Sequence, residues 1–324
     1  MSKSTSTQDY ALFRRKTFGF SLGLLLTATL SVNNGNAQDQ KASQALTSWR
    51  ELKLTSQLSA DQSVGYYAFD WKNGLKVHLC VLDLASKKYA LKPTVNSPTN
   101  PTSVTATKSG ALMAVNGGFF NLSNGESTSF VYVGGKQVCD PTTNKDLTNN
   151  PKLQPFLDTI FNRSELRIMQ GKNNSVTLGI AAHKDLTAKE TKVVHILQGG
   201  PQLLPKLTSK EEAFIRTGTD GKLVDSIGCE RTAARTACGV TADNFALIVC
   251  IPGKGQDEFA SGITLRDLSQ LLKELGATTA INFDGGTSTT MVIADSSAAG
   301  KTKMVCGKTP ETRVKSVLMI VPAK

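Results

Sequence analysis

Short apolar runs separated by polar, Gly-rich segments recur along the chain, and several of them alternate between apolar and polar residues. Alternation indicates a half-buried β-strand, and a short continuous apolar run indicates a buried one. Strands are therefore predicted at residues 74–83, 111–115, 193–197, 235–240, 245–251, 280–283, 289–293 and 314–321. The strands at 235–240 and 245–251 are expected to pair as a hairpin. His78 is expected on the polar face of the first strand.

One segment, residues 265–275, has the periodicity of an amphipathic helix. Its apolar residues recur at the spacing that places them on one helical face: Leu265, Leu268, Leu271, Leu272 and Leu275. Thr264 can cap the first turn, with Asp267 in the matching position of a capping box. Gly276 stands where a residue with positive φ ends many helices.

The remaining segments set the predicted domain organisation. Residues 38–62 are polar, and residues 38–74 are interpreted as a leader segment. Segments rich in Pro, Thr, Ser, Asn or charge are predicted to be loops at 92–109, 139–165 and 205–228, the second of them an insertion. The order of strands, with one strong helix, predicts an α+β fold. We expect a single domain, residues 75–324, of mainly antiparallel or mixed sheets with a few packed helices.

The first 37 residues follow a different pattern, in which a basic cluster at residues 14–16 precedes an uncharged, mostly apolar stretch at 18–32. Small residues follow at Gly35 and Ala37. This order is typical of a secretory signal peptide, and the stretch is shorter than the roughly 20 residues that a membrane-spanning helix needs. The sequence therefore predicts cleavage after about Ala37, export to the periplasm or the extracellular space, and no stable membrane insertion afterwards.

The chain is basic, with a formal net charge of +11. Removal of the first 37 residues takes away four basic and one acidic residue and leaves +8. A basic surface attracts polyanions. Nucleic acid is not expected as the partner of an exported protein, so the expected partner is a phosphorylated or anionic glycan. A surface charge that only keeps the protein in solution explains the same excess.

All six cysteines follow residue 37, at Cys80, Cys139, Cys229, Cys238, Cys250 and Cys306. An oxidising compartment permits disulfides, but six cysteines allow fifteen complete pairings and the sequence does not choose among them. Cys80 and Cys250 lie in predicted strands, where buried thiols are equally expected. The cysteine spacings and the three isolated histidines (His78, His183 and His195) do not fit a zinc site, so no metal or other cofactor is expected.

Three Gly-Gly turns follow directly on predicted strands: Gly117-Gly118, Gly199-Gly200 and Gly285-Gly286. A Gly pair lets the backbone adopt positive φ and approach a ligand closely, and its N–H groups can form an anion-binding nest. Each turn taken alone is better explained as a tight turn. Three together, with Asn116 and Asp284 ahead of two of them, indicate a site.

Asp284 is the most informative of these residues, because it ends a predicted strand and its carboxylate is expected to enter a cleft. Hydroxyl side chains follow at residues 288–290. Arg235 begins another strand, and its planar guanidinium suits phosphate; Arg231 competes for the same role. The alternatives are a turn cap for Asp284 and a surface ion pair for Arg235.

Six motifs occur in the order found in the phosphodiester glycosidase family. They are Asn-Gly-Gly-Phe-Phe at 116–120, Gly-Gly-Pro at 199–201, Arg-Thr-Ala-Cys-Gly at 235–239, Gly-Ile-Thr-Leu-Arg-Asp-Leu at 262–268, Ile-Asn-Phe-Asp-Gly-Gly-Thr-Ser-Thr-Thr-Met at 281–291 and the final strand at 313–321. The chain resembles this family over roughly residues 75–322. It departs from the family pattern at Thr287, which replaces the third of three consecutive Gly. The polar stretch around Glu126 is similar to the one that follows the family's first motif.

The resemblance implies a hydrolase that cleaves the bond between a sugar's anomeric carbon and the oxygen of a phosphodiester, releasing sugar and a phosphate monoester. This leaving group departs without a strong general acid, because its conjugate acid has a pKa of about 6. Asp284 and, second, Glu126 are the implied catalytic carboxylates, as nucleophile or as base for water. The implied substrate-binding residues are Asn116, Gly117, Gly118, Arg235, Gly285, Gly286, Ser288 and Thr289.

Two alternative functions fit the same residues. One is a related exported hydrolase that cleaves the P–O bond of envelope phosphoglycans; such a reaction normally needs a metal, and the scarcity of histidine disfavours it. The other is a glycan-binding or scaffolding protein of the envelope with an inactive site.

The signal-peptide interpretation predicts that the exported protein begins near Gln38. The intact mass of the protein recovered outside the cytoplasm checks this, with the full-length chain as the reference. A mass that retains residues 1–37 would show instead that the apolar stretch remains attached as an anchor.

Overall fold

The computed structural model describes residues 46–323, except for 173–174, 189–190, 259 and 299. The predicted signal peptide and the first part of the predicted leader lie outside these residues. Within the described part of the chain, no helix has the length and apolarity that crossing a membrane requires.

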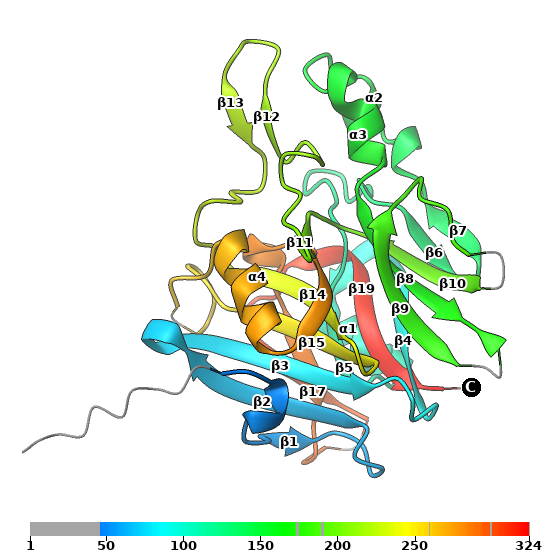
Figure 1. Ribbon diagram of the computed structural model, residues 1–324, viewed down its shortest axis with the longest axis vertical. Coiled ribbons are helices and arrows are strands. Elements are labelled where there is room, and N and C mark those ends of the chain that lie inside the picture. Colours follow the sequence, from blue (N-terminus) through cyan, green and yellow to red (C-terminus); the bar gives the residue numbers. More distant parts are fainter. Residues whose placement is uncertain (1–45, 173–174, 189–190, 259, 299, 324) are drawn as a thin grey trace, which may run out of the picture. The chain divides into compact units, whose positions relative to one another are not determined.

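Three β-sheets form the framework of the described chain (Figure 1). The seven-stranded sheet has the order β1 (Ser56–Gln57), β2 (Val64–Trp71), β3 (Leu75–Asp83), β15 (Phe245–Ile251), β14 (Arg235–Thr241), β16 (Ala277–Asn282) and β11 (Gln202–Leu204). One five-stranded sheet has the order β7 (Lys136–Cys139), β6 (Val131–Val133), β10 (Lys192–Gln198), β8 (Ser164–Gln170) and β9 (Val176–Ala182). The other has the order β18 (Thr302–Cys306), β17 (Met291–Ala294), β5 (Met113–Asn116), β19 (Arg313–Pro322) and β4 (Tyr89–Pro101).

The other elements are short. A separate hairpin joins β12 (Ile215–Thr217) to β13 (Leu223–Asp225). The helices are α1 (Thr102–Ser109), α2 (Lys145–Thr148), α3 (Leu157–Phe161) and α4 (Leu265–Glu274). Every strand pairing within the three sheets is antiparallel. The predicted α+β fold with mainly antiparallel sheets is confirmed.

The three sheets share one hydrophobic core. Cys80 from the seven-stranded sheet, Leu166 from the sheet of β8 and Val115 from the sheet of β5 belong to one packed cluster of buried side chains. Successive residues of a strand point to opposite faces, so the outer faces need a separate cover. Helix α4 covers the outer face of the seven-stranded sheet, and α1 covers that of the sheet of β5. The core thereby holds strand ends from different sheets close together.

Helix α4 confirms its sequence prediction in detail. The predicted stripe is fully buried: Leu265, Leu268, Leu271, Leu272 and Leu275. The Thr264 hydroxyl accepts from the N–H of Asp267 (3.1 Å), and Gly276 has the positive φ of +96° expected after a helix. The predicted hairpin at 235–251 is also confirmed, as β14 and β15.

Three predictions about irregular segments were wrong. Residues 64–71, assigned to a leader, form β2 and pair along β3. Residues 92–109 form most of β4 and all of α1, and the prolines of β4 are tolerated because β4 is an edge strand. Residues 205–228 contain the β12–β13 hairpin. The segment 139–165 is irregular apart from short helical turns and the first residues of β8, close to the prediction.

His78 is buried, contrary to its predicted place on a polar strand face. Its ring is hydrogen-bonded on both sides, to Tyr66 Oη (2.7 Å) and to Glu258 Oε2 (2.6 Å). All six cysteines are buried thiols in this structure.

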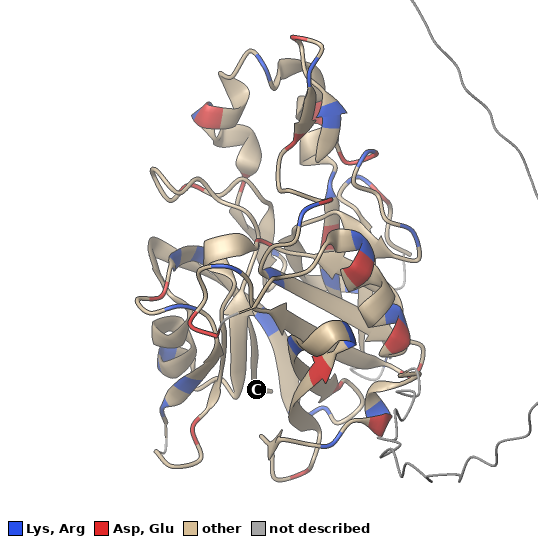
Figure 2. Ribbon diagram, turned by 90° about the vertical axis from the view of Figure 1, so that its left-hand side faces the viewer, with Lys and Arg blue, Asp and Glu red and all other residues tan. Residues whose placement is uncertain are grey.

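The charged residues are spread along many elements, with basic and acidic positions interspersed (Figure 2). The positive net charge therefore does not by itself define a polyanion-binding surface, and a binding site has to be located from its own side chains.

Candidate active site

The side chain of Asn116 joins two of the sheets. Asn116 ends β5 and is fully buried. Its Nδ2 donates to the carbonyl oxygen of Asp284 (2.6 Å), while its Oδ1 accepts from Thr236 Oγ1 on β14 (2.7 Å) and from the N–H of Thr290 (3.1 Å). Since both the oxygen and the nitrogen of this buried amide have partners within the protein, Asn116 positions the Asp284 loop in this structure.

Asp284 follows β16 and opens a loop that is held from several directions. The contacts are Asp284 N–H to Gly117 O (3.1 Å), Gly286 N–H to Ala234 O (2.8 Å), Gln256 Nε2 to Gly286 O (3.1 Å) and Thr312 Oγ1 to Thr287 O (2.6 Å). These partners belong to four separate segments, so the loop is fixed before any ligand arrives. Thr287, where the chain departs from the family pattern, takes part in this fixation through its carbonyl.

Asp284 as a whole residue is partly exposed, but its carboxylate is buried. Desolvation raises its pKa to about 6, although hydrogen bonds from Ser288 and from the N–H of Gly285 (2.9 Å) favour the ionised form. Asp284 is therefore mainly charged at neutral pH but weakly solvated by water. Perturbed carboxyl groups of this kind concentrate at functional sites.

The three Gly-Gly turns, predicted to contribute to one site, lie against one another. A Cβ atom on Gly118 would lie 2.4 Å from the carbonyl oxygen of Gln198, and one on Gly199 would lie 2.6 Å from that of Asn282. No side chain fits at such distances. These Gly residues therefore serve the approach of one backbone to another.

The predicted anion-binding nest is not available in this conformation. Each N–H group nominated for phosphate already has an acceptor within the protein: Gly117 with Ser316 O (2.8 Å), Gly118 with Ser316 Oγ (3.1 Å), Gly285 with Asp284 Oδ1 (2.9 Å) and Gly286 with Ala234 O (2.8 Å). A phosphate would have to displace these bonds, so the phosphate-binding groups are to be sought elsewhere.

Arg235 is close to the site, but its guanidinium is hydrogen-bonded to backbone carbonyl oxygens. It is buried at the start of β14. Its guanidinium donates to Ile227 O (3.0 Å), Gly228 O, Arg231 O (3.1 Å) and Ile263 O (3.3 Å). A bidentate grip on phosphate needs a free guanidinium edge, which this arrangement does not leave. The geometry instead gives Arg235 the task of ordering residues 227–231, while Arg231 itself is exposed.

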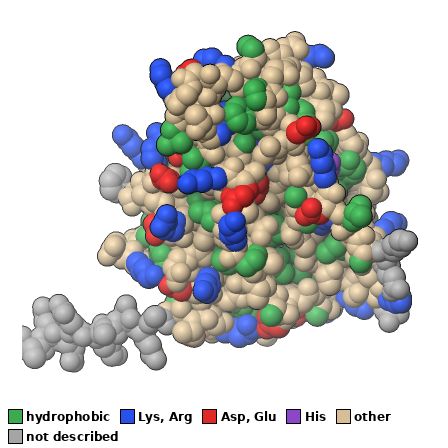
Figure 3. Space-filling model, turned by 45° about the horizontal axis from the view of Figure 1, so that its top comes forward, with side chains coloured by type: hydrophobic (Ala, Val, Ile, Leu, Met, Phe, Trp, Pro, Cys, Tyr) green, Lys and Arg blue, Asp and Glu red, His purple; other side chains and the backbone are tan. Residues whose placement is uncertain are grey.

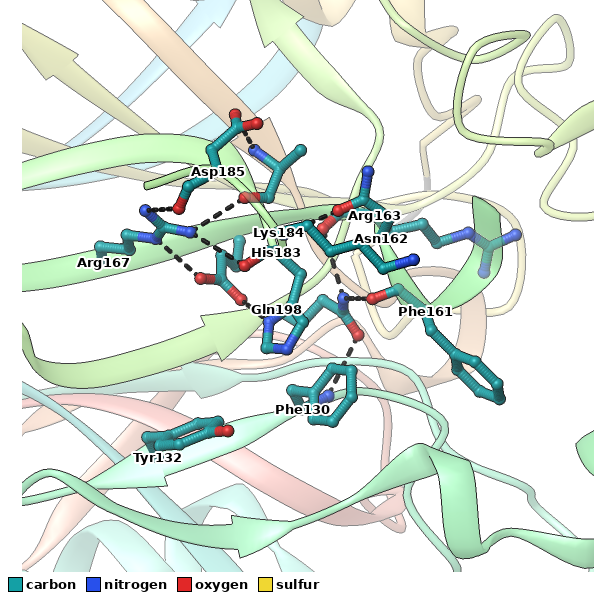
Figure 4. A network of polar contacts seen from close by, with 12 residues as sticks. Phe130, Tyr132, Phe161, Asn162, Arg163, Arg167, His183, Lys184, Asp185 and Gln198 are labelled. Carbon is teal, nitrogen blue, oxygen red and sulfur yellow. Dashed lines mark hydrogen bonds and ion pairs between the residues drawn. The ribbon is translucent and has the colours of Figure 1, made fainter. Parts of the chain in front are cut away.

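A polar network holds the turn at Gln198 (Figure 4). Gln198 accepts from the N–H of Phe130 (3.1 Å) and donates to the carbonyl oxygens of Phe161 and Arg163. The ring of Phe130 stacks on His183, with ring centroids 3.9 Å apart. The buried carboxylate of Glu165 accepts from His183 and from Arg167. This network ties together the strands of the sheet of β8, next to the turn at Gly199-Gly200.

The other predicted residues differ in accessibility. Ser288 and Thr289 are buried, and the hydroxyl of Thr289 has no hydrogen-bond partner in the described part of the chain. The side chain of Ser288 is hydrogen-bonded to the carboxylate of Asp284. Glu126 is exposed, and the structure gives its carboxylate no partner among the described residues. It is thus the most accessible of the predicted acids.

Two cavities of similar size are present near these elements. One, of about 640 Å³, lies beside the β12–β13 hairpin with Lys210, Arg266 and Asp267 in its lining and contains no predicted site residue. The other, of about 590 Å³, includes Glu126 and reaches Thr312, which contacts the Asp284 loop. The second cavity is the one that adjoins the site.

Among residues 46–323, apart from the gaps, no three His, Cys, Asp or Glu side chains are grouped closely enough to hold one metal ion. The histidines have separate partners: His78 with Glu258, His183 with Glu165, and His195 with the N–H of Gly134.

Residues 109–321 match the sequence profile of a family described as phosphodiester glycosidase. A bovine protein named N-acetylglucosamine-1-phosphodiester alpha-N-acetylglucosaminidase is 29% identical over 190 residues. That match covers 58% of this chain and 32% of the bovine protein, so this chain corresponds to about a third of its length.

Solved structures with a similar fold share little sequence. The zebrafish N-acetylglucosamine-1-phosphodiester alpha-N-acetylglucosaminidase catalytic domain, auto-inhibited by its pro-peptide, has a TM-score of 0.55 at 17% identity, covering 84% of this chain and 87% of that one. A hypothetical protein from Synechocystis has a TM-score of 0.53 at 15% identity, covering 80% and 62%. A Burkholderia pseudomallei protein named "Putative exported protein" has a TM-score of 0.50 at 17% identity, covering 80% and 74%. At these identities the likeness shows the fold alone.

The carbonyl contacts of Arg235 predict that it stabilises the fold. Arg235→Ala leaves buried carbonyl oxygens without a donor, so we expect the free energy of unfolding to fall by at least roughly 1–3 kcal/mol. Denaturant titration followed by circular dichroism measures this. Arg231→Ala, at an exposed neighbour, serves as the control and is expected to change stability by less than about 0.5 kcal/mol. Wild-type stability of Arg235→Ala together with a raised KM would instead support direct phosphate binding by Arg235.

Proposed function

This chain belongs to the phosphodiester glycosidase family, and from that premise we propose that it hydrolyses the C1–O bond of a sugar 1-phosphodiester. The observation that carries this proposal is the Asp284 carboxylate. It is buried, its pKa is raised to about 6, and its loop is held by contacts from four segments. The products are the free sugar and a phosphate monoester.

The reaction separates charge in a defined way. As the C1–O bond breaks, its electron pair stays on the phosphate oxygen and positive charge develops on the sugar ring. Water then supplies a hydroxyl group to C1 and releases one proton. The phosphate changes from a monoanionic diester to a monoester that is mostly dianionic at neutral pH. The enzyme therefore needs negative charge near the sugar ring and positive charge near the phosphate.

Asp284 is the proposed source of the negative charge. Burial strengthens the attraction between a carboxylate and a nearby positive charge, because less water screens it. The hydrogen bonds from Ser288 and Gly285 keep the carboxylate oriented without neutralising it. Since the surrounding loop is already fixed, little reorganisation accompanies the reaction, which is the condition for efficient electrostatic stabilisation.

Glu126 is proposed as the second carboxylate. Its loop is held in place by its own contacts: the N–H of Glu126 donates to Asn124 Oδ1 (2.9 Å), and its carbonyl oxygen accepts from the N–H of Asn121 (2.8 Å). The side chain remains exposed in the 590 Å³ cavity. An exposed carboxylate on a fixed loop suits the task of taking the proton from the attacking water.

The substrate class and the location follow as further proposals. The name of the bovine relative makes an N-acetylglucosamine 1-phosphodiester the first substrate to test. Export to the periplasm or beyond is supported by the leader pattern of residues 1–37, and one protein of similar fold is described as exported. A phosphorylated glycan of the cell surface would then be within reach of the enzyme.

Asp284→Asn is the central test of the proposed activity. The amide is of equal size but cannot carry negative charge, so we expect kcat to fall roughly a hundredfold or more with little change in KM. For the wild type, the rate is expected to fall as the pH drops through about 6, because Asp284 becomes protonated there. Release of sugar and phosphate monoester from an activated N-acetylglucosamine 1-phosphodiester measures both.

Asp220→Asn, an exposed substitution in the β12–β13 hairpin, is the matched control and should leave kcat unchanged. Equal unfolding midpoints for the two variants would separate catalysis from folding. If folded Asp284→Asn retained kcat within a few-fold of wild type, Asp284 would be only a turn cap, a role in which Asn and Asp are nearly equivalent.

A further inference from the structure

The 590 Å³ cavity beside the Asp284 loop has three walls from distant parts of the sequence. Residues 97–99 of β4 form one wall, the loop with Phe120, Leu122 and Glu126 forms the second, and the start of β19 with Arg313 and Lys315 forms the third. Arg313 and Lys315 bring two positive charges to a cavity whose only acidic lining residue among those described is Glu126.

An irregularity in strand pairing opens this cavity. β19 pairs with β4 at Val314 opposite Asn100 and again at Ser316 opposite Val95, with a shift of register between them. Lys315 therefore sits opposite a bulge of β4, the unpaired stretch between Val95 and Asn100 that includes residues 97–99. Bulges often re-aim a side chain next to a functional site.

The two cations differ in how they are held. Arg313 donates to the carbonyl oxygen of Thr99 and to Asn100 Oδ1 (3.1 Å), which anchors its guanidinium on the wall formed by β4. Lys315 is half-buried, and no carboxylate of the described residues lies within 4 Å of its ammonium group. A partly desolvated ammonium group without a counter-ion favours the binding of an anion.

The residue just before β19 and the start of β19 contact the loops of the site. Thr312 Oγ1 donates to Thr287 O (2.6 Å). Ser316 O accepts from the N–H of Gly117 (2.8 Å), whose own carbonyl oxygen accepts from the N–H of Asp284 (3.1 Å). Lys315 thus lies in the chain between two residues, Thr312 and Ser316, that are each hydrogen-bonded to loops of the site, and the cavity reaches the Asp284 loop through Thr312.

The second wall carries two apolar side chains beside its polar residues. Phe120 is half-buried and Leu122 is 72% exposed. Their loop is pinned because Asp146 Oδ2 accepts from both Asn121 Nδ2 (2.8 Å) and Asn124 Nδ2 (2.9 Å). An aromatic ring and an exposed leucine on a pinned loop can contact the face of a sugar or another group with apolar surface.

We propose that this cavity is the leaving-group subsite, in which Lys315 and Arg313 bind the phosphate monoester and Phe120 and Leu122 contact the group esterified to it. The inference rests on the proposed function. The negative charge of the phosphate roughly doubles as the C1–O bond breaks, so these cations bind the transition state and the product more tightly than the diester. On the face of the molecule shown in Figure 3, basic and acidic side chains are interspersed.

Phosphate binding tests the subsite without any turnover. Inorganic phosphate is titrated calorimetrically, at low ionic strength, into wild type, Lys315→Gln, Lys315→Arg and two controls. We expect Lys315→Gln to bind about tenfold more weakly, the effect of one charge-assisted contact, and Lys315→Arg to bind nearly as wild type. Lys108→Gln, on α1, and Arg266→Gln, in the 640 Å³ cavity, should bind as wild type.

Kinetics on the N-acetylglucosamine 1-phosphodiester give the second measurement. Lys315→Gln should lower kcat about tenfold, change KM less, and weaken competitive inhibition by the phosphate monoester product. Unchanged phosphate binding and unchanged product inhibition in Lys315→Gln would overturn the subsite while leaving the proposed activity intact. Loss of phosphate binding in Arg266→Gln alone would overturn it in favour of the larger cavity. A third outcome is that the wild type binds phosphate through Lys315 but does not hydrolyse the diester. This result would support the anion site and contradict the proposed function.

Discussion

The buried amide of Asn116 is the contact on which the site depends. It donates to the backbone of the Asp284 loop and accepts from Thr236 on the seven-stranded sheet, so one side chain ties two sheets to the loop. A buried amide must satisfy both its donor and its acceptor, and here each partner comes from a different element. Shifting any one of these elements would leave a buried polar group unpaired, which costs about 1–3 kcal/mol. The position of Asp284 is therefore set by the packing of the whole fold.

This rigidity explains how a single carboxylate can be useful at neutral pH. Asp284 is desolvated enough for its pKa to rise to about 6, yet Ser288 and the N–H of Gly285 still favour its charged form. Lys315 and Arg313 line the neighbouring cavity, and Thr312 and Ser316, which precede and follow them in the chain, bond to the loops of the site. In the proposed reaction, Asp284 lies on the sugar side of the C1–O bond and Lys315 and Arg313 lie on the phosphate side, which matches the direction in which charge separates when that bond breaks. Such prearranged charges stabilise a transition state without reorganisation.

Local patterns predicted those parts of the molecule that local interactions determine. The leucine spacing and the Thr264 cap identified α4, and alternation identified most of the central strands. The Gly-Gly turns were correctly grouped, but their purpose is backbone packing. The roles of Asn116 and Arg235 could not be predicted, because their partners are set by tertiary structure: Asn116 and its acceptor on Asp284 are 168 positions apart. The role of Lys315 could not be predicted either, because its position depends on the register shift between β19 and β4.

The central claim is that the enzyme breaks the bond to carbon and leaves the bond to phosphorus intact. Hydrolysis of the N-acetylglucosamine 1-phosphodiester in ¹⁸O-labelled water, with mass spectrometry of the phosphate monoester, tests this most directly. Cleavage of C1–O places the water oxygen on the sugar, so the phosphate monoester is predicted to contain no ¹⁸O. A phosphate monoester carrying one ¹⁸O atom would show cleavage at phosphorus, and it would contradict the assignment of Asp284 to a developing positive charge on the sugar.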